Sequence, residues 1–465
     1  MLHWHSKGSS ANSCLALSPW ECKLPRLPEV AFGASVAAGA RLAIADLGLG
    51  GLPAPGRMRG VSTAQKPRSV DEHGRVVAAL LAATPVIRLA LVECAGLALA
   101  EPITAAVPLP PFDNSAMDGY AVRSVDVADA TPDAPVQLPV TEDIPAGRTD
   151  SPSLQPHTAH RIMTGAPIPP GADAVVPVEL TDRGCDQVQI FAPRAPGDSV
   201  RLAGDDVAAG EEVLPAGAVL GPAQLGVAAA VGYAELPVHR PARVLVLSTG
   251  SELVVPGILL KHGQIYESNG TMLAAAVREA GGEAQLMHFV PDDVAALEAA
   301  LAPRLTGMDL LVTSGGVSAG AYEVVKSAMA GHGVDFGKVA MQPGAPQGVG
   351  RYRGVPVTAM PGNPVSASVS FEVFVRPALR AAMRLPVQRP RATARLTEAL
   401  DSPADKRQFR RGAFDPAAGT VAPIGGPGSH LLGALARSNC LIDIPETTTH
   451  LEVGEQVMVL RTGGV

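Results

Sequence analysis

The sequence predicts a multidomain α/β plus β protein. It should combine a parallel-sheet α/β domain, an inserted small β domain, an elongated linker domain of helix and strands, and a C-terminal β-barrel. The chain has 465 residues, more than one hydrophobic core usually serves. Residues 241–385 alternate strand-like and helical runs, the pattern of a parallel sheet covered by helices. Residues 108–200 and 386–465 carry short apolar runs between Pro and Gly turns, typical of small all-β units.

The first third of the chain indicates a linker domain that is interrupted by an insertion. Residues 1–67 show no sustained period, and we expect a disordered leader. A helical pattern begins at Val70, with Ser69 or Asp71 as its N-cap. Residues 201–240 resemble two short strands and a helix that return toward this first helix. We therefore expect 68–107 and 201–240 to form one unit, with 108–200 inserted into it.

The α/β domain is predicted from five β-rich runs that alternate with helical stretches, at 243–249, 284–290, 309–314, 335–341 and 356–360. This spacing predicts that all five strands are parallel. A final helix over 366–383 should close the domain near residue 385.

Composition excludes several classes of function. A net charge of −7 disfavours a nucleic-acid-binding role, which needs a concentrated basic surface. No apolar run approaches the twenty or so residues needed to cross a bilayer, and no secretory signal begins the chain. We expect a cytoplasmic protein without membrane contact. The five cysteines show neither a CxxC pair nor metal-ligand spacing.

The candidate site lies where the predicted parallel strands end, because ligands of such sheets bind beyond the carboxyl ends of the strands. Glycines there let backbone amides approach an anion, and helix N-termini add donors. The sequence therefore indicates an anion-recognising crevice, although each loop alone is also compatible with ordinary turn or cap chemistry. The residues in these loops are Thr249, Gly250, Glu252, Asp292, Ser314, Gly315, Gly316, Ser318, Pro361, Gly362, Asn363, Pro364 and Ser366.

Ionic side chains extend this hypothesis. Acidic oxygens beside a phosphate site suit Mg²⁺, and Asp292 and Glu323 follow two of the predicted strands. Arg407, Arg410 and Arg411 cluster in "DKRQFRRG", and Lys338 lies in the fourth strand region. Such cations can hold a phosphate or another tetraoxyanion, but an ordinary charged hairpin is the alternative.

Six ordered motifs resemble one family. They are "FDNSAMDGYAV", "RIMTGAPIPPGADAVV", "GDDV", "STGSEL", "SGGVSAG" and "MPGNPVSAS", and the likeness runs from about Val70 to the C-terminus. Together they resemble the MoeA/gephyrin-E family of molybdopterin molybdenumtransferases. The resemblance implies a homodimer of four-domain subunits that inserts molybdate into adenylylated molybdopterin and releases AMP with Mg²⁺ present. It also implies that the linker domain serves dimerisation, and that the chain contacts a MogA-type adenylyltransferase and molybdoenzymes.

The resemblance also implies roles for individual residues. Asp118 and Thr164 would face the site from the partner's inserted β domain, so that dimerisation completes the crevice. Asp206, Asp292 and Glu323 would be further catalytic residues, with Asp292 and Glu323 holding the metal. The loop at 361–366 would belong to the pterin pocket. The residues near molybdate would be Lys338, Arg407, Arg410 and Ser429.

The chain departs from the family pattern in a loop that normally carries two lysines. The "KPGKP" type sequence is replaced here by "QPGAP", with Gln342 and Ala345 in place of the lysines. Either molybdate is held more weakly, or Lys338 and the arginine cluster compensate. A non-catalytic molybdopterin-binding carrier or scaffold is therefore the alternative function. A lone adenylyltransferase is disfavoured, because β modules flank the α/β domain on both sides.

Overall fold

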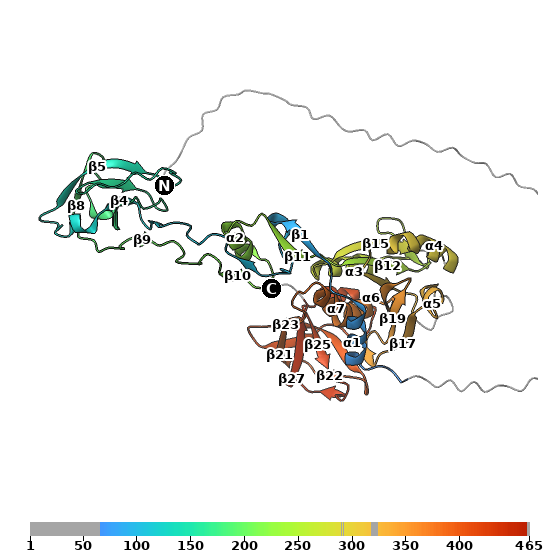
Figure 1. Cartoon of the computed structure of the whole chain (residues 1–465). Coiled ribbons are helices and arrows are strands. Elements are labelled where there is room, and N and C mark those ends of the chain that lie inside the picture. Colours follow the sequence, from blue (N-terminus) through green and yellow to red (C-terminus); the bar gives the residue numbers. More distant parts are fainter. Residues whose placement is uncertain (1–65, 290, 292, 318–323, 463–465) are drawn as a thin grey trace, which may run out of the picture. The chain divides into compact units, whose positions relative to one another are not determined.

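The computed structural model describes residues 66–289, 291, 293–317 and 324–462 (Figure 1). The predicted leader, 1–67, lies outside the described residues except for its last two positions. None of the helices in the described part of the chain is long and apolar enough to cross a membrane.

The α/β domain is built on a six-stranded sheet in the order β15-β12-β16-β20-β19-β17. The first four strands in that order pair in parallel, whereas β20, β19 and β17 pair antiparallel. The strands are β12 (Arg243–Thr249), β15 (Glu283–Phe289), β16 (Leu310–Ser314), β17 (Val334–Lys338), β19 (Pro346–Tyr352) and β20 (Val355–Met360). The helices are α3 (Asn269–Glu279), α4 (Val294–Leu305), α5 (Val324–Met329), α6 (Pro364–Ser370), the π-helical turn η4 (Phe371–Val375) and α7 (Arg376–Ala382).

Strand β12 shows why the sheet is covered on both faces. Its side chains alternate, so that Val244 and Val246 join the buried cluster that includes Leu273 of α3. Leu245 and Leu247 enter a second cluster on the opposite face, with residues of α4 and α5. A continuous apolar run such as 244–247 is typical of a sheet buried on both sides.

The fourth predicted strand differs from its prediction. Strand β17 is antiparallel to β19, and β19 itself was not expected. A parallel connection needs a crossover of a dozen or more residues, usually a helix. The described chain has no helix between Lys338 and Val355. The connection from β17 to β19, which contains the short strand at 341–342, and the turn from β19 to β20 are both too short for a parallel crossover, so the three strands alternate in direction.

Helix α1 (Val70–Leu80) begins at the N-cap Ser69, whose hydroxyl oxygen accepts a hydrogen bond of 3.1 Å from the Glu72 amide. Its buried Val70 and Val77 lie in one cluster with Phe374 of η4. Figure 1 shows α1 beside α7, and α1 contacts both α7 and η4. The sequence groups this helix with 201–240, but its apolar face packs against the helices that end the α/β domain.

The linker domain is held together by strands from both of its segments. Strand β1 (Val86–Ala90) pairs with β11 (Glu235–His239), and β2 (Ile103–Thr104) pairs with β10 (Glu212–Leu214). The short turn η1 (Leu91–Glu93) and helix α2 (Pro222–Ala230) complete it. These pairings make the chain between β2 and β10 an insertion.

The inserted part forms a five-stranded sheet in the order β7-β4-β6-β5-β8. The strands are β4 (Gly119–Val122), β5 (Val136–Ile144), β6 (Ala159–Ile162), β7 (Ala174–Pro177) and β8 (Gln187–Ile190). Strands β3 (Asn114–Ser115) and β9 (Val200–Arg201) form a separate pair, and η2 (Ser124–Val127) and η3 (Val178–Leu180) are short turns. A Cβ at Gly119 would lie 2.0 Å from the Val176 carbonyl oxygen, so this glycine lets β4 and β7 approach closely.

The C-terminal domain is a closed barrel of five strands, because β23 pairs with both β24 and β25. The strands are β21 (Arg391–Leu396), β23 (Arg407–Asp415), β24 (Thr420–Pro423), β25 (Cys440–Ile444) and β27 (Gln456–Arg461). Helix α8 (Leu432–Ala436) and the pair β22 (Leu400–Asp401) and β26 (His450–Leu451) are added to it.

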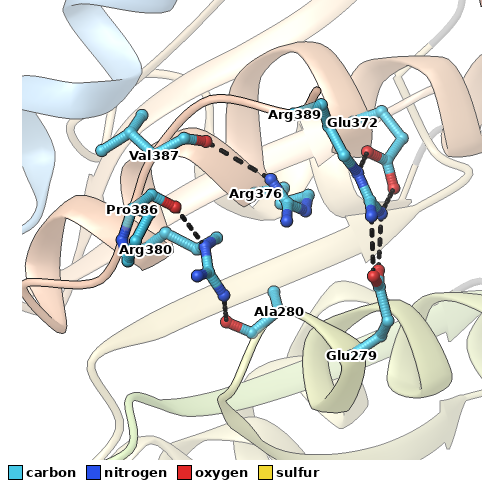
Figure 2. A network of polar contacts seen from close by, with 8 residues as sticks. All are labelled: Glu279, Ala280, Glu372, Arg376, Arg380, Pro386, Val387 and Arg389. Carbon is cyan, nitrogen blue, oxygen red and sulfur yellow. Dashed lines mark hydrogen bonds and ion pairs between the residues drawn. The ribbon is translucent and has the colours of Figure 1, made fainter. Parts of the chain in front are cut away.

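Several contacts join the α/β domain to the barrel and to the segment that leads into it, among them a strand pairing and an ion-pair network. Strand β18 (Met341–Gln342) leaves the α/β domain and pairs in parallel with the start of β23. Between α7 and β21, Arg389 forms ion pairs with Glu372 and Glu279, at 2.9 and 2.6 Å (Figure 2). The side chains of Arg389 and Glu372 are only 12% and 10% exposed, so this is a largely buried pair.

Candidate functional site

A cleft of about 1030 Å³ opens at the carboxyl ends of β12, β16 and β20. Its walls are the loops after these strands, the segment at 341–346 and a barrel segment at 427–432. The structure brings twelve of the expected site residues to this cleft, all from the α/β domain except the last. They are Thr249, Gly250, Glu252, Ser314, Gly315, Gly316, Pro361, Gly362, Asn363, Pro364, Ser366 and Ser429.

The wall after β12 is fixed by Glu267, which lies between β14 (Ile265–Tyr266) and α3. Its carboxylate accepts hydrogen bonds from the Ser248 hydroxyl and the Gly270 amide, at 2.9 and 2.5 Å. His288 Nε2 lies 3.7 Å from the other carboxylate oxygen. Glu267 is 2% exposed, and its two hydrogen bonds connect the start of α3 with the end of β12.

The loop after β16 depends on two glycines. Gly315 and Gly316 have φ values of +93° and +70°, which L side chains rarely adopt. A Cβ at Gly315 would also lie 2.8 Å from the Thr249 carbonyl oxygen. The loop can therefore run close beside the end of β12 only because these positions carry no side chain.

Asn269 connects two of the loops. Its side-chain amide donates to the Ser314 hydroxyl at 2.9 Å and to the Gly362 carbonyl at 2.6 Å. Asn269 thereby connects the start of α3 with the ends of the paired strands β16 and β20.

The loop after β20 is joined to the barrel through Ser429. The Asn363 side-chain amide donates to the Ser429 hydroxyl at 2.9 Å, and the Val365 amide donates to the Ser429 carbonyl at 3.0 Å. These two bonds place a barrel hydroxyl at the start of α6, which makes the cleft a site shared by two domains.

The arginine cluster does not line the cleft. Arg407 forms a two-bond ion pair with Asp443, both bonds 2.7 Å, and a further ion pair with Asp71 at 3.1 Å. Its hydrogen bonds with Asp443 raise the pKa of Arg407 above its usual range. Arg407 instead lines a second cavity, of about 330 Å³, beside α1 and α7.

Arg410 and Arg411 support the barrel segment that contributes to the cleft. Arg410 is 8% exposed and donates to the Gly425 carbonyl at 3.1 Å. Arg411 is 1% exposed and donates to the carbonyls of Gly426 and Gly428. Burial lowers the pKa of both guanidinium groups. Lys338 is exposed at the end of β17 and does not line the cleft.

The expected residues outside the α/β and barrel domains do not line this cleft either. Asp118 accepts hydrogen bonds from the amide and hydroxyl of Thr164, at 2.7 and 2.8 Å. These bonds lower the pKa of Asp118, with the backbone bond as the largest cause. Asp206 is exposed, and its amide donates to the Leu109 carbonyl at 2.9 Å.

Asp292, Ser318 and Glu323 lie outside the described residues. Within the described ranges, no group of three or more His, Cys, Asp or Glu side chains is arranged to hold a metal ion. Glu252 and Glu267 are the described carboxylates that line the cleft.

Sequence reasoning missed several residues of the cleft. Glu267 and Asn269 lie in "YESN", directly before a helix, where polar residues are ordinary caps. They lie at the start of the helix that follows the first parallel strand, well after the strand end itself, so attention to the helix N-terminus was the signal that could have found them. Lys406 and His430 also line the cleft, but no strand of the α/β sheet precedes them.

Comparison with known proteins gives consistent matches along the chain. Residues 68–232 match the family profile of the MoeA N-terminal region (domain I and II), residues 245–381 that of a probable molybdopterin binding domain, and residues 393–461 that of the MoeA C-terminal region (domain IV). Molybdopterin molybdenumtransferase 2 of Mycobacterium tuberculosis is 56% identical over 400 residues, which cover 84% of this chain and 99% of the relative. Molybdopterin molybdenumtransferase 1 of the same organism is 39% identical over 84% of this chain and 98% of its own length.

Solved structures give the same result. A molybdopterin biosynthesis MoeA protein from Pyrococcus horikoshii aligns with a TM-score of 0.73 and 32% identity, over 86% of this chain and all of the solved chain. A second structure of such a protein from this organism aligns with a TM-score of 0.69 and 29% identity, over 85% of this chain and all of its own.

Proposed function

Since the chain belongs to the MoeA family of molybdopterin molybdenumtransferases, we propose that it inserts molybdate into adenylylated molybdopterin and releases AMP. It is then a transferase of molybdenum cofactor biosynthesis. The observation that supports this most directly is the shared cleft, because three strand ends and a barrel segment meet around polar groups and glycines. Such a site can surround a large substrate that carries both a heterocycle and phosphates.

Different polar groups of the cleft suit the adenylylated molybdopterin and the molybdate. Glycine-rich backbone at Gly315 and Gly316 suits the phosphate part of the adenylate. The loop at 361–366 and Ser314 suit the pterin, whose ring nitrogens and amino group need hydrogen-bonding partners. Ser429, held by Asn363, would then act near molybdate at the barrel side of the cleft.

Mg²⁺ is part of the proposal. This ion takes one or two protein carboxylates, keeps several waters and uses substrate phosphates for the remaining positions. Glu252 lines the cleft and fits such a role in part. From the sequence, Asp292 and Glu323 are the candidate ligands. Bound Mg²⁺ would neutralise negative charge on the phosphates.

We also propose that the protein is cytoplasmic and that it forms a homodimer, which completes the site. Asp118 and Thr164 form one polar unit in the inserted domain, yet neither lines the cleft of its own chain. A partner subunit could bring this unit to the cleft, and Asp206 with it. Delivery of the adenylate by a MogA-type adenylyltransferase, and transfer of the product to molybdoenzymes, would follow from the same reaction.

One assay tests the function. The purified full chain is incubated with adenylylated molybdopterin and Mg²⁺, and AMP release is measured with and without molybdate. We expect molybdate to accelerate AMP release. If no AMP is released at millimolar molybdate while the adenylate remains bound, the non-catalytic carrier is the better assignment. The uncharged residues Gln342 and Ala345 in the cleft are the reason for this alternative.

A second experiment tests the metal assignment. Replacing Glu323 by Ala should leave adenylate binding largely intact and stop AMP release. AMP release at the wild-type rate from Glu323→Ala would contradict the assignment of this residue to the metal.

A further inference from the structure

We propose that the second cavity binds a small organic acid, whose carboxylate is held by the guanidinium group of Arg376. This cavity has a volume of about 330 Å³ and is lined by α1, η4, α7, the segment before β21 and strands of the barrel. Its described lining residues and those of the cleft have no member in common. The proposal therefore does not depend on the proposed reaction.

Arg376, at the start of α7, is a buried cation without a counterion. It is 6% exposed, and its Nη1 donates to the Val387 carbonyl at 3.3 Å (Figure 2). Its Nε has no hydrogen-bond partner in the described part of the chain, where no carboxylate forms an ion pair with it either. Burial, and to a smaller extent Arg389, lowers the pKa of Arg376. An unpaired buried charge is costly, so a ligand that supplies the counterion would bind favourably here.

The carboxylates of the cavity are engaged with other arginines. Glu372 is bound by Arg389 at 2.9 Å, and Asp443 by Arg407 at 2.7 Å. Asp71 also belongs to the second group, 3.1 Å from Arg407. The described lining residues include five arginines against three carboxylates, which favours an anionic ligand.

One desolvated cation sets the charge of the ligand. Arg75 and Arg391 also line the cavity, but both are exposed and therefore solvated. Arg376 is left as the buried arginine that needs a partner, which favours a singly charged carboxylate over a phosphate dianion. A planar guanidinium group can donate two parallel hydrogen bonds to such a carboxylate.

Apolar side chains form much of the remaining wall. Phe374 and Pro377 contribute from the helices that end the α/β domain, and Phe409 and Leu460 from the barrel. The volume lies at the lower end of the range for small-molecule sites. The cavity therefore suits an acid with a small apolar body, which would pack against these side chains while its carboxylate meets the guanidinium group.

Gly74 keeps the α1 side of the cavity open. It lies inside α1, where glycine is less favourable than alanine. Outside the helix, the nearest heavy atom to an added Cβ would be Phe374 Cδ1 at 3.8 Å, an ordinary contact distance. Packing therefore does not require a glycine at this position. A larger side chain would extend into the cavity, so the glycine preserves the space that a ligand needs.

The test measures the binding of benzoate and hexanoate to the full chain by isothermal titration calorimetry. We expect each acid to bind at one site per chain, and benzyl alcohol and hexanol, which lack the carboxylate, not to bind. Arg376→Met should raise the Kd of both acids by about tenfold or more, the range of a lost hydrogen bond to a charged group. Arg376→Lys keeps the charge without the planar fork and should retain part of the affinity.

Arg380→Met is the matched control for the loss of an arginine. Arg380 lies one turn further along α7 and donates to the carbonyls of Pro386 and Ala280, and it does not line the cavity (Figure 2). Its substitution should leave the Kd of both acids unchanged.

Thermal unfolding distinguishes a ligand site from a structural arginine. Without ligand, Arg376→Met should unfold at or above the wild-type midpoint, because an unpaired buried charge is removed. Benzoate near saturation should raise the midpoint of the wild type by about 3 °C and that of Arg376→Met hardly at all. A structural arginine would give the reverse, a lowered midpoint in Arg376→Met with the benzoate shift retained.

Gly74→Leu tests the location of the site, because it fills the cavity without changing a charge. It should abolish the binding of both acids, whereas Ala79→Leu, at an exposed position of α1 outside the cavity, should not. Unchanged affinity in Arg376→Met or in Gly74→Leu would overturn the proposal, and so would a wild-type chain that binds neither acid. Tighter binding of inorganic phosphate than of either acid would overturn the assignment to a carboxylate. None of these measurements uses AMP release, so failure of the proposed reaction would leave their outcome unaffected.

Discussion

The side-chain amide of Asn363 donates a hydrogen bond of 2.9 Å to the Ser429 hydroxyl, which connects the loop after β20 to the barrel in the wall of the cleft. Asn363→Ala and Ser429→Ala should each weaken substrate binding. The double variant should lose less than the sum, with a coupling of about 1 kcal/mol. KM values for the adenylate, measured for both single variants and the double variant, check this. Strictly additive effects would show that the bond does not shape the site.

The backbone at Gly315 cannot accept a side chain without a shift of the loop. Its φ is +93°, and an added Cβ would lie 2.8 Å from the Thr249 carbonyl oxygen. Gly315→Ala should therefore destabilise the protein by about 1–3 kcal/mol and impair substrate binding. Denaturant unfolding and adenylate affinity measure the two effects. Gly337→Ala is the matched control, because a Cβ at Gly337 meets nothing within 4 Å. Similar losses in both variants would refute the steric explanation.

The hydrogen bonds from Thr164 keep the Asp118 carboxylate ionised at lower pH than usual. Its contribution to stability is present above the ordinary pKa of an aspartate and is lost as pH falls through the lowered pKa. Thr164→Val removes the hydroxyl bond and should move the Asp118 pKa upward. Thr164→Ser keeps the hydroxyl and should not. Carboxyl NMR titration of Asp-labelled protein resolves the shift, and identical titrations of all three proteins would exclude a role for the hydroxyl.

His73 makes the protein sensitive to acid. Burial against Phe374, with a smaller effect from Arg68, lowers the pKa of this histidine to about 4. In the unfolded chain His73 titrates near 6.5, so below that pH the unfolded state binds more protons and stability falls until about pH 4. The full effect is about 3 kcal/mol. His73→Phe should flatten the pH dependence of the unfolding free energy in this window, and an unchanged slope would contradict the prediction.

Arg389 should be a large contributor to stability. Arg389→Met would leave the buried carboxylate of Glu372 without a partner and should cost about 3 kcal/mol. Adding Glu372→Met should recover much of that loss, since two apolar side chains then replace the pair. Arg391→Met, at an exposed position, should change stability by less than about 0.5 kcal/mol. Urea unfolding of the four proteins distinguishes these outcomes. A double variant less stable than Arg389→Met would argue against an uncompensated charge.

Much of the fold could be predicted because local pattern and tertiary role coincide. Every residue of 244–249 is buried, as the alternation of strand-like and helical runs predicted for a sheet covered by helices. Strand β19 has no apolar run that would have predicted it, since "PQGVGRY" mixes glycine and polar residues. It is an antiparallel strand next to the edge strand of the sheet. Helix α1 was recognised as a helix, but its partner, Phe374, lies 304 positions after Val70, and no local pattern encodes that contact.

The candidate site was accessible to prediction where it follows strand ends. Thr249, Ser314 and Asn363 meet in one cleft because parallel strands finish at one edge of a sheet. The barrel contribution was harder to predict. In sequence, Lys406 and Arg407 are adjacent cations, yet one lines the cleft and the other is paired with Asp443. Only the register of β23 against β18 and β25 distinguishes them.

The parallel pairing of β18 with β23 has a consequence for dissecting the protein by truncation. A chain shortened to end after α7 would keep the whole six-stranded sheet. It would lose β23, with which Met341 and Gln342 pair, together with Ser429 and Lys406 of the cleft wall. Such a fragment would expose an unsupported loop where one wall of the cleft should be. The barrel therefore cannot be treated as a detachable module, and the smallest active fragment must extend through the end of β27.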